Sequence, residues 1–211
     1  MDQISIPNPK LFVEKKKECE QYFFTDKILE QITTTFRYIN NIVCICAPSV
    51  ADAFWRFQKK EVYCIDIDDR FNYLPKFIHC DITKDEVKLP ENFIPDLIII
   101  DPPFFGLKMI DLFNFVEKIT KQNKKTKIAI GYIIREEKTL LTCFKEYNLQ
   151  MTKFKMEYRT VDQTKWNNYA MYTNFEDGKL KYVFKKKRKK IINKIINISI
   201  NNINNIFNYY L

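Results

Sequence analysis

The sequence predicts an α/β fold with a mostly parallel seven-stranded sheet and a closing antiparallel hairpin. Short, unbroken apolar runs such as 42–47 and 97–100 suit strands that are buried on both faces. Segments of helical length, with apolar residues at helical spacing, separate these runs. The part from 151 to 184 instead alternates apolar and polar residues, and its Asp177-Gly178 pair is typical of a hairpin turn.

The expected elements alternate along the chain, which argues for parallel strands joined by right-handed crossovers. In the first helix, Ile28, Leu29, Ile32 and Phe36 would share one face, and Thr25 or Asp26 would cap its start. The expected strands are 42–47, 62–66, 77–80, 97–100, 127–132, 151–159, 169–175 and, after the hairpin turn, 179–184. The expected helices are 26–38, 50–59, 107–120 and 136–147.

The buried run Leu97–Ile100 leads directly into Asp101, Pro102, Pro103 and Phe104. Two prolines fix the backbone and lack an amide donor, so the chain leaves this strand rigidly. In a plain Pro-Pro turn, Asp101 would only be a turn acceptor. A carboxylate at the carboxyl end of a parallel strand, however, lies where open α/β sheets bind ligands. The segment therefore indicates a functional site.

Composition divides the chain into a lead over 1–18, a globular body over 19–184 and a basic tail over 185–211. The formal net charge is +9, and the tail holds 6 Lys, 1 Arg and no acidic residue, hence +7. The remainder of the chain therefore carries only +2. Since nucleic-acid binders need a basic footprint, the tail is the part that could supply such a contact.

The sequence favours neither a metal site nor a membrane anchor. Six cysteines are scattered and His79 is the single histidine, a poor set for zinc. No apolar run approaches the length of a bilayer span, and the first ten residues lack the apolar core of a signal peptide. Buried free thiols suit a reducing, cytoplasmic location, while the KKKRKK run at 185–190 leaves a nuclear address open.

The segment Asp101–Phe104 resembles motif IV, [DN]-P-P-[FYW], of S-adenosylmethionine-dependent amino-methyltransferases. In that motif an amine donates hydrogen bonds to the acid oxygen and to the carbonyl of the first proline. The aromatic ring packs on the group that carries the amine. The resemblance implies catalytic roles for Asp101, Pro102, Pro103 and Phe104, with S-adenosyl-L-methionine as the cofactor.

Most of the body, roughly residues 19–178, resembles the small family described as "probable N6-adenine methyltransferase". The resemblance implies a Rossmann-like methyltransferase fold. It is carried by the segments QYFFTD (21–26), ICAPSV (45–50), DIDDRF (66–71) and DPPFFG (101–106), with a weaker similarity in YRTVDQTKWNNYAMYTNF (158–175).

The resemblance also implies where the cofactor binds. In this family a [CA]-P-[ST] turn replaces the usual Gly-rich loop, which explains how a chain with only 3 glycines could bind a nucleoside. Here that turn is Ala47, Pro48 and Ser49, and it is expected to line the methionine side.

Three further parts of the chain complete the expected cofactor site. A carboxylate ending the second strand is the usual ribose ligand of doubly wound sheets, so Asp66 would accept from the ribose hydroxyls, with Asp68 as its competitor. Asp81, ending the third strand, would contact the adenine amine. The expected segment that closes over the cofactor contains Gln21, Tyr22 and Thr25.

Two branches of the family leave the substrate open. Chain length, QYFFTD and ICAPSV resemble the branch that methylates a lysine of translation elongation factor 1-alpha. DIDDRF and DPPFFG are closer to the zinc-finger branch that methylates adenine N6 in ribosomal RNA, whose Cys/His clusters this chain lacks. A lysine must first be neutralised, which costs roughly 4–5 kcal/mol at pH 7, whereas adenine's amine needs no deprotonation. Overall layout favours the elongation-factor lysine, with adenine N6 and an inactive binding subunit as alternatives.

Overall fold

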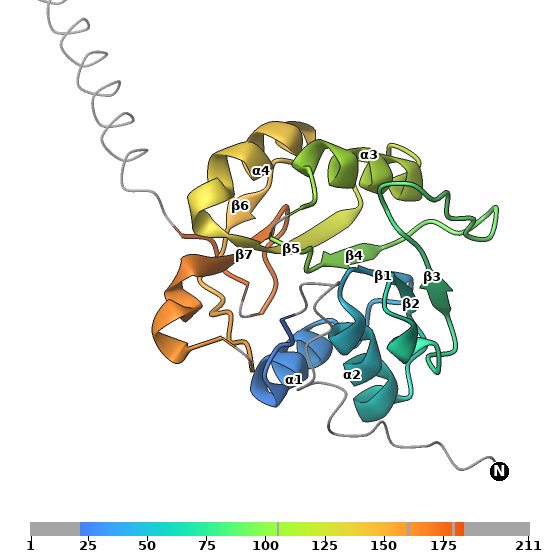
Figure 1. Cartoon of the computed structure of the whole chain (residues 1–211), viewed down its shortest axis with the longest axis horizontal. Helices are drawn as coiled ribbons and strands as arrows, with labels where there is room; N and C mark the ends of the chain where they lie inside the picture. Colours follow the sequence, from blue (N-terminus) through green and yellow to red (C-terminus); the bar gives the residue numbers. More distant parts are fainter. Residues whose placement is uncertain (1–21, 105, 160, 179, 184–211) are drawn as a thin grey trace, which may run out of the picture.

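A computed structural model describes residues 22–104, 106–159, 161–178 and 180–183. It contains one seven-stranded sheet in the order β3-β2-β1-β4-β5-β7-β6 (Figure 1). The strands are β1 Ile42–Ile45, β2 Tyr63–Asp66, β3 Phe77–His79, β4 Leu97–Ile100, β5 Lys127–Ile133, β6 Gln150–Met151 and β7 Tyr169–Thr173. The helices are α1 Asp26–Thr35, α2 Pro48–Gln58, α3 Met109–Thr120 and α4 Glu137–Cys143, with 3-10 turns η2 Asp69–Phe71, η3 Ile134–Glu136, η4 Lys145–Tyr147 and η5 Gln163–Asn168.

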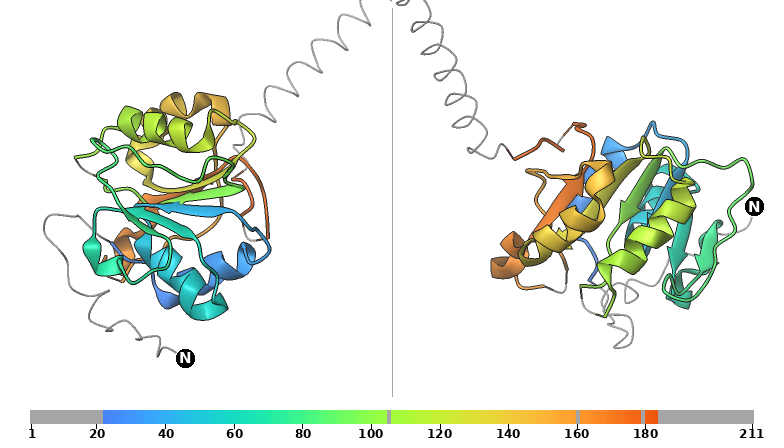
Figure 2. Two further views of the ribbon diagram at one scale, coloured as in Figure 1. Left: turned by 90° about the vertical axis from the view of Figure 1, so that its right-hand side faces the viewer. Right: turned by 90° about the horizontal axis from the view of Figure 1, so that it is seen from above.

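The predicted fold class is confirmed. Strands β1 to β5 pair in parallel, and β7 runs antiparallel to both β5 and β6. Helices α1 and α2 cover one face of the sheet, and α3 and α4 cover the other (Figure 2). Every residue of β1 and β4 is buried, as their unbroken apolar sequences predict.

The strand predicted over 151–159 is wrong beyond Met151. After β6 the chain leaves the sheet, and Tyr158 instead forms an isolated antiparallel bridge with Phe24, just before α1. The alternation of this segment therefore reflects packing against the N-terminal part of the chain. The turn expected at Asp177-Gly178 is present, with the Leu180 N–H donating to the Asp177 carbonyl at 2.7 Å. The described residues 180–183 after it form only isolated bridges and not the expected strand.

The strand order identifies the part of the sheet where a ligand would bind. Strand order reverses where β1 lies between β2 and β4, and the carboxyl ends of these three strands meet at the same edge. Such a switch point is where open α/β sheets hold ligands. Cys46, Ile67 and Asp101 directly follow the three strands there.

The predicted lead over 1–18 and tail over 185–211 lie outside the described residues. Within the described part of the chain, no helix has the length and apolar character required to span a bilayer. That same part contains no group of three or more His, Cys, Asp or Glu arranged to hold a metal ion.

Candidate functional site

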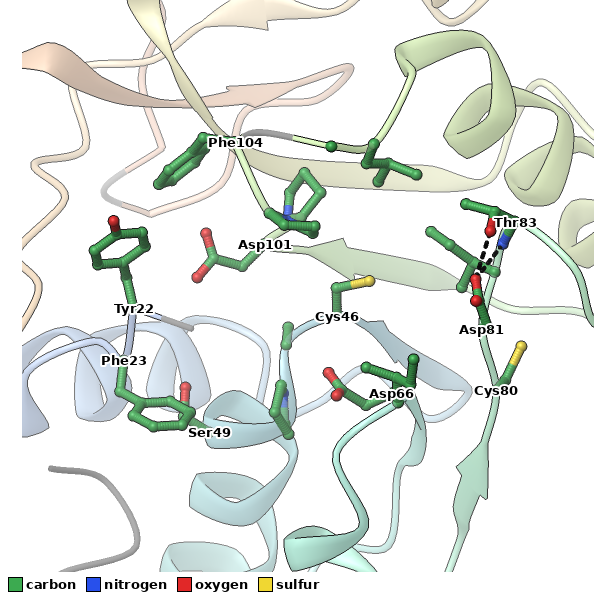
Figure 3. A pocket seen from close by; sticks show the side chains of 18 residues that line it. Tyr22, Phe23, Cys46, Ser49, Asp66, Cys80, Asp81, Thr83, Asp101 and Phe104 are labelled. Carbon is green, nitrogen blue, oxygen red and sulfur yellow. Dashed lines mark hydrogen bonds between the residues drawn. The ribbon is translucent and has the colours of Figure 1, made fainter. Parts of the chain in front are cut away.

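A cavity of about 480 Å³ opens at the carboxyl ends of β1, β2 and β4 (Figure 3). It brings together most of the site residues expected from the sequence, namely Tyr22, Ala47, Pro48, Ser49, Asp66, Asp81, Asp101, Pro102, Pro103 and Phe104. Gln21 lies outside the described residues. Thr25 is described but does not line the cavity, because it stands at the start of α1 and its backbone N–H donates to the Glu157 carbonyl.

The turn from β1 into α2 forms one wall of the cavity. Cys46 has a φ of 51°, the left-handed region that usually takes glycine, so a cysteine fills the conformational role of the missing glycine here. Pro48 occupies the first turn of α2, where its lack of an N–H costs nothing. Ser49 follows it and is buried at the cavity wall.

Asp66 ends β2 and is only 5% exposed. One of its carboxylate oxygens accepts from the backbone N–H of Asp68 at 2.8 Å. Burial raises the pKa of Asp66 from 3.8 to about 7, and the backbone hydrogen bond from Asp68 partly offsets this. The Asp66 carboxyl group therefore changes its charge near neutral pH.

Asp68, the competitor for the ribose role, faces elsewhere. It is 0% exposed and does not line the cavity. Its carboxylate pairs with the Arg70 guanidinium at 2.6 Å and also accepts from the Arg70 backbone N–H. This makes Asp68 a local cap for η2, so Asp66 is the acid of this segment that faces the ligand space.

Asp81 lies on the far side of the cavity from the turn (Figure 3). It accepts from the Thr83 backbone N–H and hydroxyl and from the Lys84 ammonium at 2.7 Å. These hydrogen bonds, with Lys84 the largest contributor, lower the pKa of Asp81 to about 2. Asp81 therefore stays ionised throughout the range in which Asp66 titrates.

Asp101 follows β4 on the side of the cavity where Tyr22 and Phe104 lie (Figure 3). Its Oδ1 accepts from the Tyr158 hydroxyl at 2.9 Å. Burial raises the pKa of Asp101 well above its usual range, and the Tyr158 hydrogen bond opposes that rise. No described residue donates a hydrogen bond to Oδ2, so this oxygen remains open to a ligand.

Comparison with known proteins agrees with the sequence and the geometry. A family model described as "Probable N6-adenine methyltransferase" matches residues 15–177, well over half of the chain. The chain belongs to this family. The resemblance seen in the sequence is thereby confirmed, while the choice between its branches stays a prediction. No curated protein sequence matches the chain.

Two solved structures are similar to this chain at low sequence identity. The N-methyltransferase NodS from Bradyrhizobium japonicum WM9, in complex with S-adenosyl-L-homocysteine, has a TM-score of 0.48 and 11% identity, covering 81% of this chain and 92% of its own. A putative RNA methyltransferase from Pyrococcus horikoshii has a TM-score of 0.48 and 16% identity, covering 77% and 88%.

Sequence reasoning missed the aliphatic wall of this cavity. The aliphatic wall contributed by Ile67, Ile82 and Leu107 lines the cavity, and Ile67 is 45% exposed although it is apolar. Its position after Asp66 could have identified it. Sequence reasoning also missed Tyr169, whose ring centroid lies 4.9 Å from that of Phe104, while the expected residues Phe104 and Tyr22 stack with centroids 5.8 Å apart.

Proposed function

We propose that the protein is an S-adenosylmethionine-dependent N-methyltransferase whose acceptor is a lysine amine, with translation elongation factor 1-alpha as the first candidate substrate. The observation that carries the proposal is the position of Asp101. Its open oxygen shares one cavity with Asp66 and with an aromatic wall. Cofactor and acceptor could therefore meet beside this carboxylate.

The residues present fit the cofactor. Asp66 can accept from ribose hydroxyls, and Ile67 offers an apolar surface for a base. The start of α2 at Ser49 suits a carboxylate, because helix N-termini present free N–H groups and a positive dipole end. Asp81 remains the candidate for the adenine amine. When bound, the cofactor supplies a methyl group on a sulfonium.

Asp101 and its neighbours would position the acceptor. An amine N–H can donate to Asp101 Oδ2 and a second one to the carbonyl of Pro102, which aims the nitrogen lone pair. The ring of Phe104 packs on the group that carries the amine. The ionised Asp101 carboxylate can take the proton that leaves an ammonium at Oδ2 before the nitrogen takes the methyl group, and a pKa raised by burial strengthens its hold on that proton.

The charge of the cavity supports a lysine. Its described lining includes three carboxylates, Asp66, Asp81 and Asp101, and no Lys or Arg. The ionised forms of these acids attract a cationic amine, and no side chain of this lining offers a positive charge to a nucleic-acid phosphate. The aromatic faces around Phe104 also attract an ammonium by cation–π interaction, so removal of its proton is left to Asp101.

Adenine N6 is the second candidate, and two observations favour it. The family description itself names adenine. The stacked pair of Phe104 and Tyr22 offers flat surfaces on which a base can stack. In that case phosphate contacts would have to come from outside the cavity, and the basic run over 185–190 is the candidate source.

Cofactor affinity should depend on pH through Asp66. Because the pKa of Asp66 is about 7, its ionised, hydrogen-bond-accepting form is lost as the pH falls through that value. If only this form binds the ribose hydroxyls, affinity for S-adenosylhomocysteine should be about tenfold weaker at pH 6 than at pH 8. Calorimetric titration at several pH values measures this. A flat profile would remove Asp66 from the ribose role.

The function is tested by transfer of a labelled methyl group to a lysate that is then separated into protein and RNA. Label in a protein band, mapped to lysine by mass spectrometry, is the expected result. Label in RNA as N6-methyladenine would instead establish the second candidate. Binding of S-adenosylhomocysteine without transfer to either fraction would identify an inactive, ligand-binding subunit.

A chain lacking residues 185–211 is the matched control for that experiment. The deletion removes +7 of the +9 charge and no residue of the cavity. With a lysine acceptor, catalytic efficiency and its salt dependence should change little. With an RNA acceptor, affinity should fall strongly and its salt dependence should become flatter, because phosphate contacts are lost.

A further inference from the structure

Tyr158 lies far from Asp101 in the sequence and is its hydrogen-bonding partner in the fold. The hydroxyl donates to Oδ1 at 2.9 Å, and the side chain is completely buried. The ring stacks on Phe24 at 4.8 Å and meets Tyr169 edge-on at 5.1 Å. Packing on these rings fixes the direction in which the hydroxyl points.

Gly131 in β5 provides the space for this hydrogen bond. A Cβ atom at this position would lie 3.0 Å from Asp101 Oδ1, 3.6 Å from the Tyr158 hydroxyl and 2.6 Å from the terminal methyl of Met156. A bare backbone in the middle of a buried strand weakens the strand, so it needs a reason such as close approach of another group. Here the groups that approach are the end of Met156 and the pair of Asp101 and Tyr158.

The segment that carries Tyr158 is tied to the segment that leads into the cavity. The Thr25 N–H donates to the Glu157 carbonyl at 3.0 Å, and the Arg159 N–H donates to the Phe23 carbonyl at 2.8 Å. An ion pair of Lys27 with Glu157 at 2.6 Å reinforces this pairing. The hydroxyl is therefore held by the same short ladder that holds the residues next to Tyr22.

We propose that Tyr158 is a positioning residue: by occupying Oδ1 it fixes the Asp101 carboxylate so that Oδ2 alone faces the acceptor amine. This inference rests on the proposed function of Asp101. The two carboxylate oxygens of Asp101 differ in their partners. Oδ1 accepts from the buried Tyr158 hydroxyl, whereas Oδ2 has no donor among the described residues. Gly131 makes this arrangement possible, because its lack of a side chain allows Oδ1 to approach β5.

The hydrogen bond from Tyr158 also affects the pKa of Asp101. Tyr22 lies beside Asp101 at the cavity (Figure 3), and two further titratable groups near Asp101 are Cys46, after β1, and Tyr169, in β7. Both are neutral at pH 7 because burial raises their pKa values. The Tyr158 hydrogen bond is thus the main interaction that favours the ionised carboxylate. Without it, the pKa of Asp101 should rise further.

Tyr158→Phe tests the inference because it removes only the hydroxyl. We expect the kcat of methyl transfer to fall roughly 10- to 100-fold, the loss typical of a hydrogen bond to a charged group. Affinity for S-adenosylhomocysteine should stay within about twofold, since the cofactor residues are untouched. The acid limb of the kcat profile should move to higher pH. A wild-type kcat and an unshifted profile would overturn the inference.

The matched control is Tyr172→Phe in β7. Tyr172 is equally buried, but its hydroxyl has no hydrogen-bond partner among the described residues, so its removal should leave kcat and the pH profile unchanged. A loss of kcat as large as that of Tyr158→Phe would mean that any core hydroxyl matters, and would overturn the positioning role.

A second readout separates this inference from the proposed function. The carboxyl carbon of Asp101 can be titrated by NMR in the ligand-free protein, with and without the Tyr158→Phe change. A higher pKa in the variant supports the positioning role even if the wild-type protein transfers no methyl group. An unchanged pKa overturns it even if the wild-type protein is active.

Discussion

Asp101→Ala should reduce methyl transfer by at least about 100-fold while leaving cofactor affinity within a few-fold of wild type. The Asp101 carboxylate is expected to hold the acceptor amine through its open Oδ2. The ribose of the cofactor is expected at Asp66 instead. Without the carboxylate, the amine loses the hydrogen bond that aligns it, and an ammonium loses the acceptor for its proton. Turnover by purified protein and calorimetry with S-adenosylhomocysteine measure the two quantities separately.

Asp101→Asn is the matched variant, because it keeps the size of the side chain and one oxygen acceptor. If the acceptor is adenine, the amide oxygen suffices to align the amine, and much of the activity should remain. If the acceptor is a lysine ammonium, the variant should be nearly as inactive as Asp101→Ala, since an amide cannot take the proton. Wild-type turnover by the alanine variant would show that the Asp-Pro-Pro-Phe segment has no catalytic role.

Asp66→Ala should have the second largest effect, on cofactor binding. Loss of a charged hydrogen-bond acceptor should weaken the affinity for S-adenosylhomocysteine by about 1.5–3 kcal/mol. Turnover at saturating cofactor should change much less, because Asp101 and Phe104 are untouched. The dependence of affinity on pH between 6 and 8 should also disappear, since Asp66 is the carboxyl group expected to titrate there.

Asp68→Ala provides the comparison for that variant. Asp68 pairs with Arg70 away from the cavity, so its loss should lower the melting temperature more than the cofactor affinity. Leaving the Arg70 guanidinium without its buried partner is the physical reason. A larger loss of affinity at Asp68 than at Asp66 would show that the ribose ligand had been assigned to the wrong acid.

The sequence was sufficient to predict the parallel part of the sheet and the acids that follow its strands. Unbroken apolar runs identify buried parallel strands, and β1 and β4 begin where the runs begin. Because the carboxyl ends of such strands share one edge, the apolar runs alone predict that Asp66 and Asp101 lie near each other. Both line the cavity.

The partner of Asp101 could not be derived in the same way. Tyr158 lies in a segment that alternates like a strand but does not join the sheet, because it pairs with Phe24 instead. The alternation of apolar and polar residues shows which side chains are buried, but not which part of the chain packs on them. It therefore cannot distinguish a strand of the sheet from a segment that pairs with Phe24. The one signal was the weak family similarity that begins at Tyr158, and it assigns no role to the hydroxyl.

The turn around Cys46 and Pro48 has a thermodynamic consequence. A glycine-rich loop samples many conformations and loses backbone entropy when a ligand orders it. In this protein the ring of Pro48 fixes φ at one position, Cys46 two residues before it is already in the left-handed region, and Ser49 after it is buried. Little backbone freedom is left to lose when a ligand arrives at this wall. Cofactor binding should therefore carry a smaller unfavourable entropy than in a protein with a Gly-rich loop, because this part of the site is ordered beforehand.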